Sequence, residues 1–316
     1  MTNAEQPRWA TGIDLGGTKT EAILLDAGGS ERWRRRVATP GGSYHDILDS
    51  LCALVLAARE QAAGHGAAQP PTLGIGGPGA LTADGRLKNA NTTRLNGQRV
   101  TDDLAARLGQ PVRYANDANC LALSEATDGA AAGAGVVFAA ILGTGTGAGI
   151  AINGQVLSGP NRLAGEWGHN PLPWRRDSGP DSDPLWRCYC GQTGCVETLV
   201  SGPGIARDHA LRHGGELSAA QIAAAAAVDT DCAASLARWH DRLARALAGV
   251  INLLDPDVIV LGGGLSRIAG TCDAVTARWG QWVFAGGVRE PVRTRLLLSQ
   301  HGDSSGVRGA AWLWRP

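Results

Sequence analysis

Two short segments of this 316-residue chain share one local pattern, and this repeat constrains the fold more than any other feature. Residues 15–23 read LGGTKTEAI and residues 142–150 read LGTGTGAGI. Each segment has the pattern of a strand end, a turn of glycine and threonine, and a returning strand. Two such hairpins, one in each half, predict a duplicated α/β domain whose turns face a shared cleft. One difference between the copies concerns a carboxylate, because Asp14 beside the first hairpin corresponds to Ile141 beside the second.

Both turns have the composition of a phosphate-binding loop. Glycine lets backbone N–H groups point at a polyphosphate with no side chain in the way, and threonine adds hydroxyl donors. Either turn alone is weak evidence, since a tight hairpin or a relaxed dinucleotide fingerprint also fits. The pair favours a triphosphate. The predicted nucleotide contacts are Gly16, Gly17, Thr18 and Lys19 of the first turn, and Gly143, Thr144, Gly145, Thr146 and Gly147 of the second.

Other residues extend this predicted nucleotide site. Asp14 ends the strand before the first turn, where a carboxylate would hold Mg²⁺ against the phosphates, directly or through water. Lys19, one of two lysines against 27 arginines, is predicted to pair with a phosphate oxygen, and an exposed turn lysine is the alternative. Residues following a short apolar strand are predicted to lie on the adenosine side, and these are Gly262, Gly263 and Gly264.

Asn116 and Asp117 follow a short apolar strand and open the next helix. Phosphoryl transfer to an alcohol needs a base within hydrogen-bond reach of the attacking hydroxyl, and Asp117 is the candidate base. Asp and Asn are also the commonest helix N-caps, so capping is an equally weighted alternative for this pair.

Three cysteines within eight residues have the spacing of a metal site. Cys188, Cys190 and Cys195 are interleaved with glycines that allow sharp turns, and His169 is the natural fourth ligand. A closed Cys₃His zinc site has no open position, so this zinc would be structural. A redox role is the alternative, although the spacing differs from that of thioredoxin-type pairs.

The metal site would also organise a binding surface for a sugar. One ring nitrogen of His169 would bind the metal, and the other would be free to contact a sugar hydroxyl. Glu166 and Glu197 lie close to the ligands in the sequence, and a carboxylate can accept hydrogen bonds from two vicinal hydroxyls. Ordinary surface glutamates are the alternative interpretation.

Charge and hydropathy exclude several classes of partner. The formal net charge is zero, which argues against nucleic acid and against an acidic membrane surface. The sequence contains no apolar run of membrane-spanning length and no N-terminal basic segment followed by an apolar core. We therefore expect a cytoplasmic protein.

In this order, several motifs resemble those of the ROK family of sugar kinases and repressors. They are GIDLGGTK at 12–19, NDAN at 116–119, the second glycine turn, GEWGH at 165–169 and CYCGQTGCVE at 188–197. Other segments are similar to the bacterial fructokinase (mannofructokinase) branch of the family, namely KNAN at 88–91, LNG at 95–97, HNPLPW at 169–174 and HGDSSGVRG at 301–309. The segment 174–187 is longer than in typical glucokinases of the family, and it could cover the sugar or a neighbouring subunit.

The resemblance implies an actin-like ATPase (ribonuclease H-like) fold of two lobes with a cleft between them. The expected lobes are residues 1–117 with 301–316, and residues 118–300. It also implies ATP, Mg²⁺, a structural Zn²⁺ and a homodimer. Asp117 would be the base, and the sugar would contact Gly77, Pro78, Gly79, Asn91, Asn116, Glu166, His169 and Glu197.

The expected reaction is transfer of the γ-phosphoryl group of ATP to the 6-hydroxyl of D-fructose, with mannose or glucose as slower acceptors. An N-acetylglucosamine kinase or glucokinase of the same family is the alternative. A sugar-sensing regulator or an ATP-dependent chaperone is a rival of another class. About ten residues precede the first expected strand, which leaves no room for the DNA-binding segment of the family's repressors.

Overall fold

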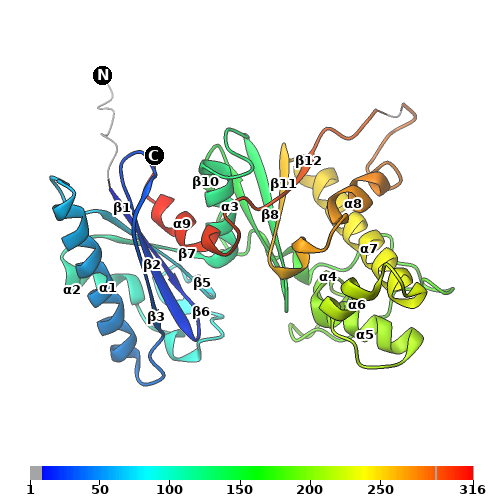
Figure 1. Ribbon diagram of the computed structural model, residues 1–316, viewed down its shortest axis with the longest axis horizontal. Helices are drawn as coiled ribbons and strands as arrows, with labels where there is room; N and C mark the ends of the chain where they lie inside the picture. Colours follow the sequence, from blue (N-terminus) through cyan, green and yellow to red (C-terminus); the bar gives the residue numbers. More distant parts are fainter. Residues whose placement is uncertain (1–8, 289, 316) are drawn as a thin grey trace.

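The computed structural model describes residues 9–288 and 290–315, and they form two α/β lobes (Figure 1). Each lobe is built on a five-stranded mixed sheet. The first sheet has the strand order β3-β2-β1-β4-β7, and the second has the order β10-β9-β8-β11-β12. The strands of the first sheet are β1 (Ala10–Leu15), β2 (Lys19–Leu25), β3 (Glu31–Ala38), β4 (Thr72–Gly77) and β7 (Val112–Asn116). Those of the second are β8 (Val136–Leu142), β9 (Thr146–Ile152), β10 (Gln155–Val156), β11 (Val258–Gly262) and β12 (Arg295–Leu298).

The two sheets are copies of one arrangement, which confirms the predicted duplication. In the first, the hairpin β1–β2 is antiparallel, and β4 and β7 add parallel strands on the β1 side. In the second, the hairpin β8–β9 is antiparallel, and β11 and β12 add parallel strands on the β8 side. The glycine turns therefore occupy equivalent positions in the two lobes. A small additional sheet pairs β5 (Ala80–Leu81) with β6 (Leu87–Lys88).

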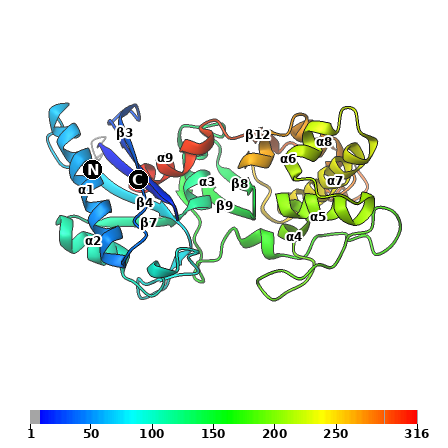
Figure 2. The ribbon, with the colours of Figure 1, turned by 60° about the horizontal axis from the view of Figure 1, so that its bottom comes forward.

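The helices cover the sheets and line the space between them (Figures 1 and 2). They are α1 (Tyr44–Gly64), α2 (Val100–Leu108), α3 (Asp117–Thr127), α4 (Val196–Val200), α5 (Gly202–His213), α6 (Ala219–Ala225), α7 (Thr230–Leu254), α8 (Thr271–Trp279) and α9 (Ser305–Trp312). Short 3₁₀ segments are η1 (Thr93–Leu95), η2 (Glu166–His169), η3 (Gly264–Arg267) and η4 (Gly302–Ser304). Among the helices of the described ranges, none is both long enough and apolar enough to cross a membrane.

Local signals in the sequence account for several element ends. Ser43 caps α1 by accepting a hydrogen bond from the backbone N–H of Asp46, whose side chain reaches back to the Ser43 backbone. Asn153 and Gly154 both have positive φ, 49° and 74°, as a type I′ hairpin turn requires. Asp255 ends α7 in the left-handed conformation, directly before Pro256.

Helices α3 and α9 lie side by side between the two sheets. Helix α9 packs on β1 and β4 of the first sheet, whereas α3 packs on β8 and β9 of the second. The helices meet at Gly309, where an added Cβ would collide with the backbone carbonyl of Cys120. This packing agrees with the lobes expected from the sequence, whose boundaries at 117 and 301 stay a prediction.

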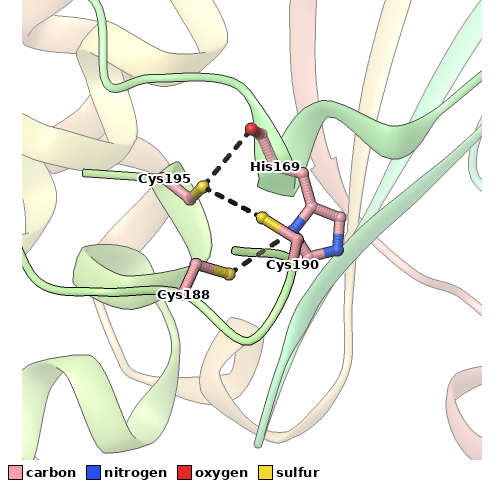
Figure 3. A group of neighbouring side chains, drawn as sticks. All are labelled: His169, Cys188, Cys190 and Cys195. Atoms are coloured by element: carbon pink, nitrogen blue, oxygen red, sulfur yellow. Dashed lines mark hydrogen bonds between the residues drawn. The ribbon is translucent and has the colours of Figure 1, made fainter. Parts of the chain in front are cut away.

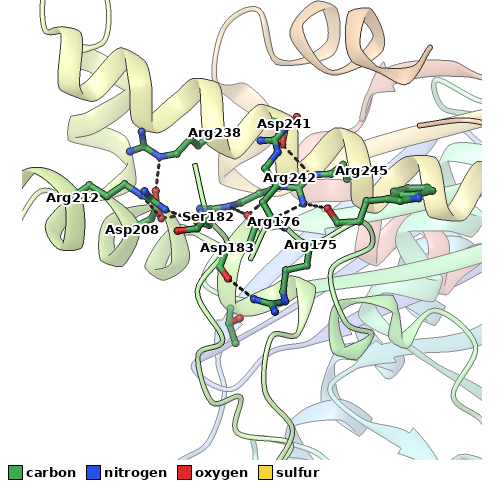
Figure 4. Close-up of polar contacts among 12 residues, drawn as sticks. Arg175, Arg176, Ser182, Asp183, Asp208, Arg212, Arg238, Asp241, Arg242 and Arg245 are labelled. Carbon is green, nitrogen blue, oxygen red and sulfur yellow. Dashed lines mark hydrogen bonds and ion pairs between the residues drawn. The ribbon is translucent and has the colours of Figure 1, made fainter. Parts of the chain in front are cut away.

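The segment 174–187 lies against α5 and α7 (Figure 4). Asp183, only 2% exposed, accepts hydrogen bonds from Arg242 Nε and Arg245 Nη1, both at 2.8 Å. Burial of this ion pair is tolerated because each carboxylate oxygen is matched by guanidinium N–H groups. The segment is therefore held against α7, and no residue of it lines the sugar-sized cavity described next.

Candidate functional site

A cavity of about 920 Å³ lies between the two lobes, within the range of about 300–1,000 Å³ typical of small-molecule sites. Five of the predicted sugar residues line it, from both lobes: Gly79, Asn91, Asn116, Glu166 and His169. Sequence reasoning missed other lining residues, among them Tyr114, Arg162, Leu163 and Tyr189. The structure thus brings most of the predicted sugar contacts together around one space.

The structure shows that Asn116 and Asp117 both bind the first free backbone N–H of α3. Asn116 is the N-cap of α3, and its Oδ1 accepts a hydrogen bond from the backbone N–H of Ala118 at 2.8 Å. Asp117 is the first residue of the helix, and its Oδ1 accepts from the same N–H at 2.8 Å. Burial raises the pKa of the Asp117 carboxyl above its ordinary value. A raised pKa suits a general base, but Asp117 is not among the residues that line the cavity, and its role as the base stays a prediction.

Asp14 lies at the end of β1 and is electrostatically coupled to Asp117. Burial, and then the charge of Asp117, raise the pKa of Asp14 to about 6. Two neighbouring carboxylates that repel each other are stabilised by a bound divalent cation, because its positive charge offsets their repulsion. Helix α9 approaches closely here, since a Cβ on Gly306 would lie 3.5 Å from Asp14 Oδ2. The residues present fit a magnesium site.

The four predicted zinc ligands converge at one point (Figure 3). The ligand atoms of His169, Cys188, Cys190 and Cys195 all lie within 4.8 Å of one another. His169 Nδ1 is 3.6 Å from Cys188 Sγ, and Cys190 Sγ is 3.7 Å from Cys195 Sγ. Sulfur atoms bound to one tetrahedral zinc at about 2.3 Å are separated by about 3.8 Å. The donor set and its spacing fit zinc, whereas a disulfide would need sulfurs at about 2.05 Å.

Glu197 lies away from the cavity lining. Its Oε2 accepts a hydrogen bond from the backbone N–H of Thr146 at 2.9 Å, and a Cβ on Gly145 would lie 2.8 Å from the same oxygen. Glu197 therefore joins α4, which follows the cysteine cage, to the second glycine turn. Gly77 and Pro78 also lie outside the lining, although Pro78 O accepts a hydrogen bond from the lining residue Tyr114 at 2.6 Å. The sugar contacts of these three residues stay predictions.

A second cavity, of about 1,010 Å³, lies beside the second glycine turn. Gly143, Thr144 and Gly264 line it, as predicted for phosphate and adenosine contacts. Much of its wall is alanine from α6 and the residues that follow it, Ala219, Ala220, Ala223, Ala224, Ala226 and Ala227. An apolar slot next to a glycine turn is a suitable shape for a base and its phosphates.

The remaining predicted nucleotide residues lie near these features without lining either cavity. Gly145, Thr146 and Gly147 continue the second turn into β9, and Gly262 and Gly263 lead from β11 to η3. The first turn closes with a hydrogen bond from Gly16 N–H to Lys19 O at 3.1 Å, and Gly17, Thr18 and Lys19 are exposed. An exposed turn facing solvent is available to phosphate, and its nucleotide contacts stay predictions.

Duplicated sheets, paired glycine turns, an aspartate at the start of α3 and a Cys₃His cage together define a two-lobe α/β fold of the actin-like ATPase type. The chain belongs to the ROK family, whose model, "ROK family", matches residues 10–316. Among curated proteins it is 39% identical over 305 residues to an N-acetyl-D-glucosamine kinase of Escherichia coli O139:H28 (strain E24377A / ETEC). That match covers 96% of this chain and 98% of the relative.

Solved structures of the family have the same fold. The ROK hexokinase from Thermus thermophilus superposes with a TM-score of 0.81 at 27% identity, covering 96% of this chain and 97% of that one. A ROK family glucokinase from Streptomyces griseus, in complex with glucose and AMPPNP, superposes with a TM-score of 0.71 at 29% identity. That match covers 96% of this chain and 98% of the glucokinase. The family and the two-lobe fold expected from the sequence are confirmed. The fructokinase branch is not supported, because curated relatives that are 39% and 38% identical to this chain are N-acetyl-D-glucosamine kinases.

Proposed function

We propose that this protein is an ATP-dependent N-acetyl-D-glucosamine kinase that transfers the γ-phosphoryl group to the sugar's 6-hydroxyl. The observation that carries the proposal is the 39% identity to such a kinase across almost the full length of both chains. Fructose, the acceptor expected from the sequence, has no support from these relatives. Glucose is the second candidate acceptor, because the glucokinase that resembles this fold was solved with glucose and AMPPNP.

In the proposed reaction, Asp117 accepts the proton of the 6-hydroxyl as its oxygen attacks the γ-phosphorus, and ADP leaves with the bridging oxygen. The raised pKa of the Asp117 carboxyl favours this proton transfer, since a carboxylate with a higher pKa is the stronger base. Asn116 and Glu166 line the cavity and orient the sugar, and His169 lines it beside them. The second glycine turn and the alanine-walled cavity hold the nucleotide.

Two metal ions complete the proposal. Asp14 would hold Mg²⁺, which neutralises charge on the transferred phosphoryl group when it is bound. His169, Cys188, Cys190 and Cys195 would hold a structural Zn²⁺ that fixes the wall of the sugar cavity. A homodimer in the cytoplasm, as the resemblance implies, is part of the same proposal.

A coupled assay of ADP release tests the acceptor. The purified protein is given ATP and Mg²⁺ with N-acetylglucosamine, glucose, mannose, fructose or N-acetylmannosamine, or with no sugar. We expect the highest kcat/KM with N-acetylglucosamine and no ADP release without sugar. A higher kcat/KM with fructose would overturn the proposed acceptor, and ADP release that is independent of sugar would overturn the kinase assignment.

A further inference from the structure

Tyr189 occupies an unusual place in the sugar cavity. It lies between two of the predicted metal ligands, Cys188 and Cys190, so the cage fixes its backbone. Its side chain is 83% exposed and lines the cavity. The ring stands edge-on to the His169 ring, with centroids 5.1 Å apart and an interplanar angle of 88°. Its hydroxyl oxygen lies 3.0 Å from His169 Nε2.

The hydrogen-bond roles in this pair follow from the cage. His169 Nδ1 is the ring nitrogen that faces the sulfur atoms, and Nε2 points away from them (Figure 3). An imidazole whose Nδ1 binds a metal carries its proton on Nε2. Nε2–H therefore donates to the Tyr189 oxygen. A hydroxyl that accepts one hydrogen bond still has its own proton to donate. In the part of the chain that the structure describes, His169 is the only hydrogen-bond partner of this hydroxyl.

Sugar geometry indicates what that proton would meet. A 6-hydroxyl that reacts at Asp117 places C6 beside the neighbouring lining residue Asn116. In a pyranose ring, C5, which carries C6, and C2 are opposite corners. The substituent on C2 therefore points away from Asp117, and Tyr189 is a lining residue with a hydroxyl proton available to meet it. An acetamido group on C2 extends further from the ring than a hydroxyl does, and its carbonyl oxygen is a good acceptor.

We propose that Tyr189 is a specificity-determining residue whose hydroxyl, held by His169 Nε2, donates a hydrogen bond to the carbonyl oxygen of a 2-acetamido sugar. The inference rests on the proposed function and adds the residue that would recognise the N-acetyl group. Glucose has no carbonyl at C2, and its 2-hydroxyl extends less far from the ring, so this donor favours the acetamido sugar.

The test compares Tyr189→Phe with the unaltered protein on N-acetylglucosamine and on glucose. We measure kcat/KM by ADP release, the dissociation constant of each sugar by calorimetry, and zinc content. Losing one neutral hydrogen bond lowers kcat/KM and affinity for N-acetylglucosamine about tenfold. The values for glucose and the zinc content stay unchanged. Because the side chain is largely exposed, removing its hydroxyl leaves the fold intact.

Tyr114→Phe is the matched control. Tyr114 lines the same cavity, but its hydroxyl already donates to Pro78 O at 2.6 Å, so this change leaves the ratio of the two sugars unaltered. If Tyr189→Phe lowered kcat/KM equally for both sugars, or for neither, the role of Tyr189 would be overturned and the proposed function would stand. An unaltered protein that neither binds nor phosphorylates N-acetylglucosamine would overturn the proposed function together with this inference.

Discussion

Glu197 Oε2 accepts a hydrogen bond from the backbone N–H of Thr146 at 2.9 Å, and this contact ties the cysteine cage to the second glycine turn. The cage borders the sugar cavity, and the turn borders the nucleotide cavity. One carboxylate thus links the two predicted substrate sites. The sequence alone suggested a sugar contact for Glu197, and the two roles lead to different kinetics.

We expect Glu197→Ala to raise the KM for ATP about tenfold, because the Thr146 N–H loses its acceptor and the turn loses its support. Glu197→Gln should stay close to the unaltered protein, since an amide oxygen still accepts. Steady-state kinetics with each substrate varied in turn measures both constants. A rise confined to the KM for the sugar in both variants would instead support the sugar contact predicted from the sequence.

Replacing the base should separate chemistry from binding. Asp117→Asn is expected to lower kcat by about 10²–10⁴-fold, because the amide cannot accept the proton of the attacking hydroxyl. Affinity for the sugar, measured by calorimetry, should change little. Asp177→Asn in the segment 174–187 is the control, since the side chain of Asp177 is 75% exposed and lines neither cavity. Near-normal kcat in Asp117→Asn would show that the base is another group.

Asp14 should make the protein less stable as pH rises. Its pKa is raised from 3.8 to about 6, so folding favours the protonated form. The stabilisation is fully present below pH 3.8 and is lost as pH rises through 6. In magnesium-free buffer at about pH 8, Asp14→Asn should therefore be more stable to urea than the unaltered protein, by up to about 3 kcal/mol. The difference should vanish below pH 3.8, and a constant difference would contradict the burial argument.

Removing the cage metal should weaken sugar binding. Metal analysis should find one zinc for each chain, and Cys195→Ser should lose it. Without zinc, His169 and Tyr189 are no longer held in place, so we expect a higher KM for the sugar while the KM for ATP changes less. Cys272→Ser, a half-buried cysteine outside the cage, is the matched control. Unchanged zinc content in Cys195→Ser would contradict the assigned ligand set.

The buried ion pairs on α7 should matter more for stability than for chemistry (Figure 4). Asp183→Asn leaves Arg242 and Arg245 without their shared carboxylate, and such a loss costs about 3–5 kcal/mol. Asp177→Asn in the same segment should cost less than about 0.5 kcal/mol, since it removes only an exposed pair with Arg175. Urea unfolding measures both. A similar loss of unfolding free energy in the two variants would show that burial of Asp183 does not contribute to stability.

Local patterns were sufficient to predict the duplicated hairpins, the cap at Ser43 and the turn at Asn153, because each depends on residues that are adjacent in the sequence. The convergence of the four cage residues was also predictable, since their residue types and spacing follow from the chemistry of a metal site. The base role of Asp117 stays a prediction. These segments carry the family resemblance as well, which the full-length match confirms.

Features that depend on distant contacts were not predictable. The alanines that wall the nucleotide cavity carry little periodic signal, because alanine fits both core and surface. Arginines such as Arg238, Arg242 and Arg245 are usually expected on a solvated helix face. Here they are buried, because they form ion pairs with Asp183 and Asp208, which belong to other segments of the chain. The position of Glu197 likewise depends on how α4 meets the glycine turn.

The meeting of α3 and α9 at Gly309 has a mechanical consequence. Backbone touches backbone at that crossing, so the lobes already stand there at the closest spacing that any residue permits. Gly309 and Cys120 line neither cavity, yet a larger residue at 309 would force the two helices, and the lobes on which they pack, further apart.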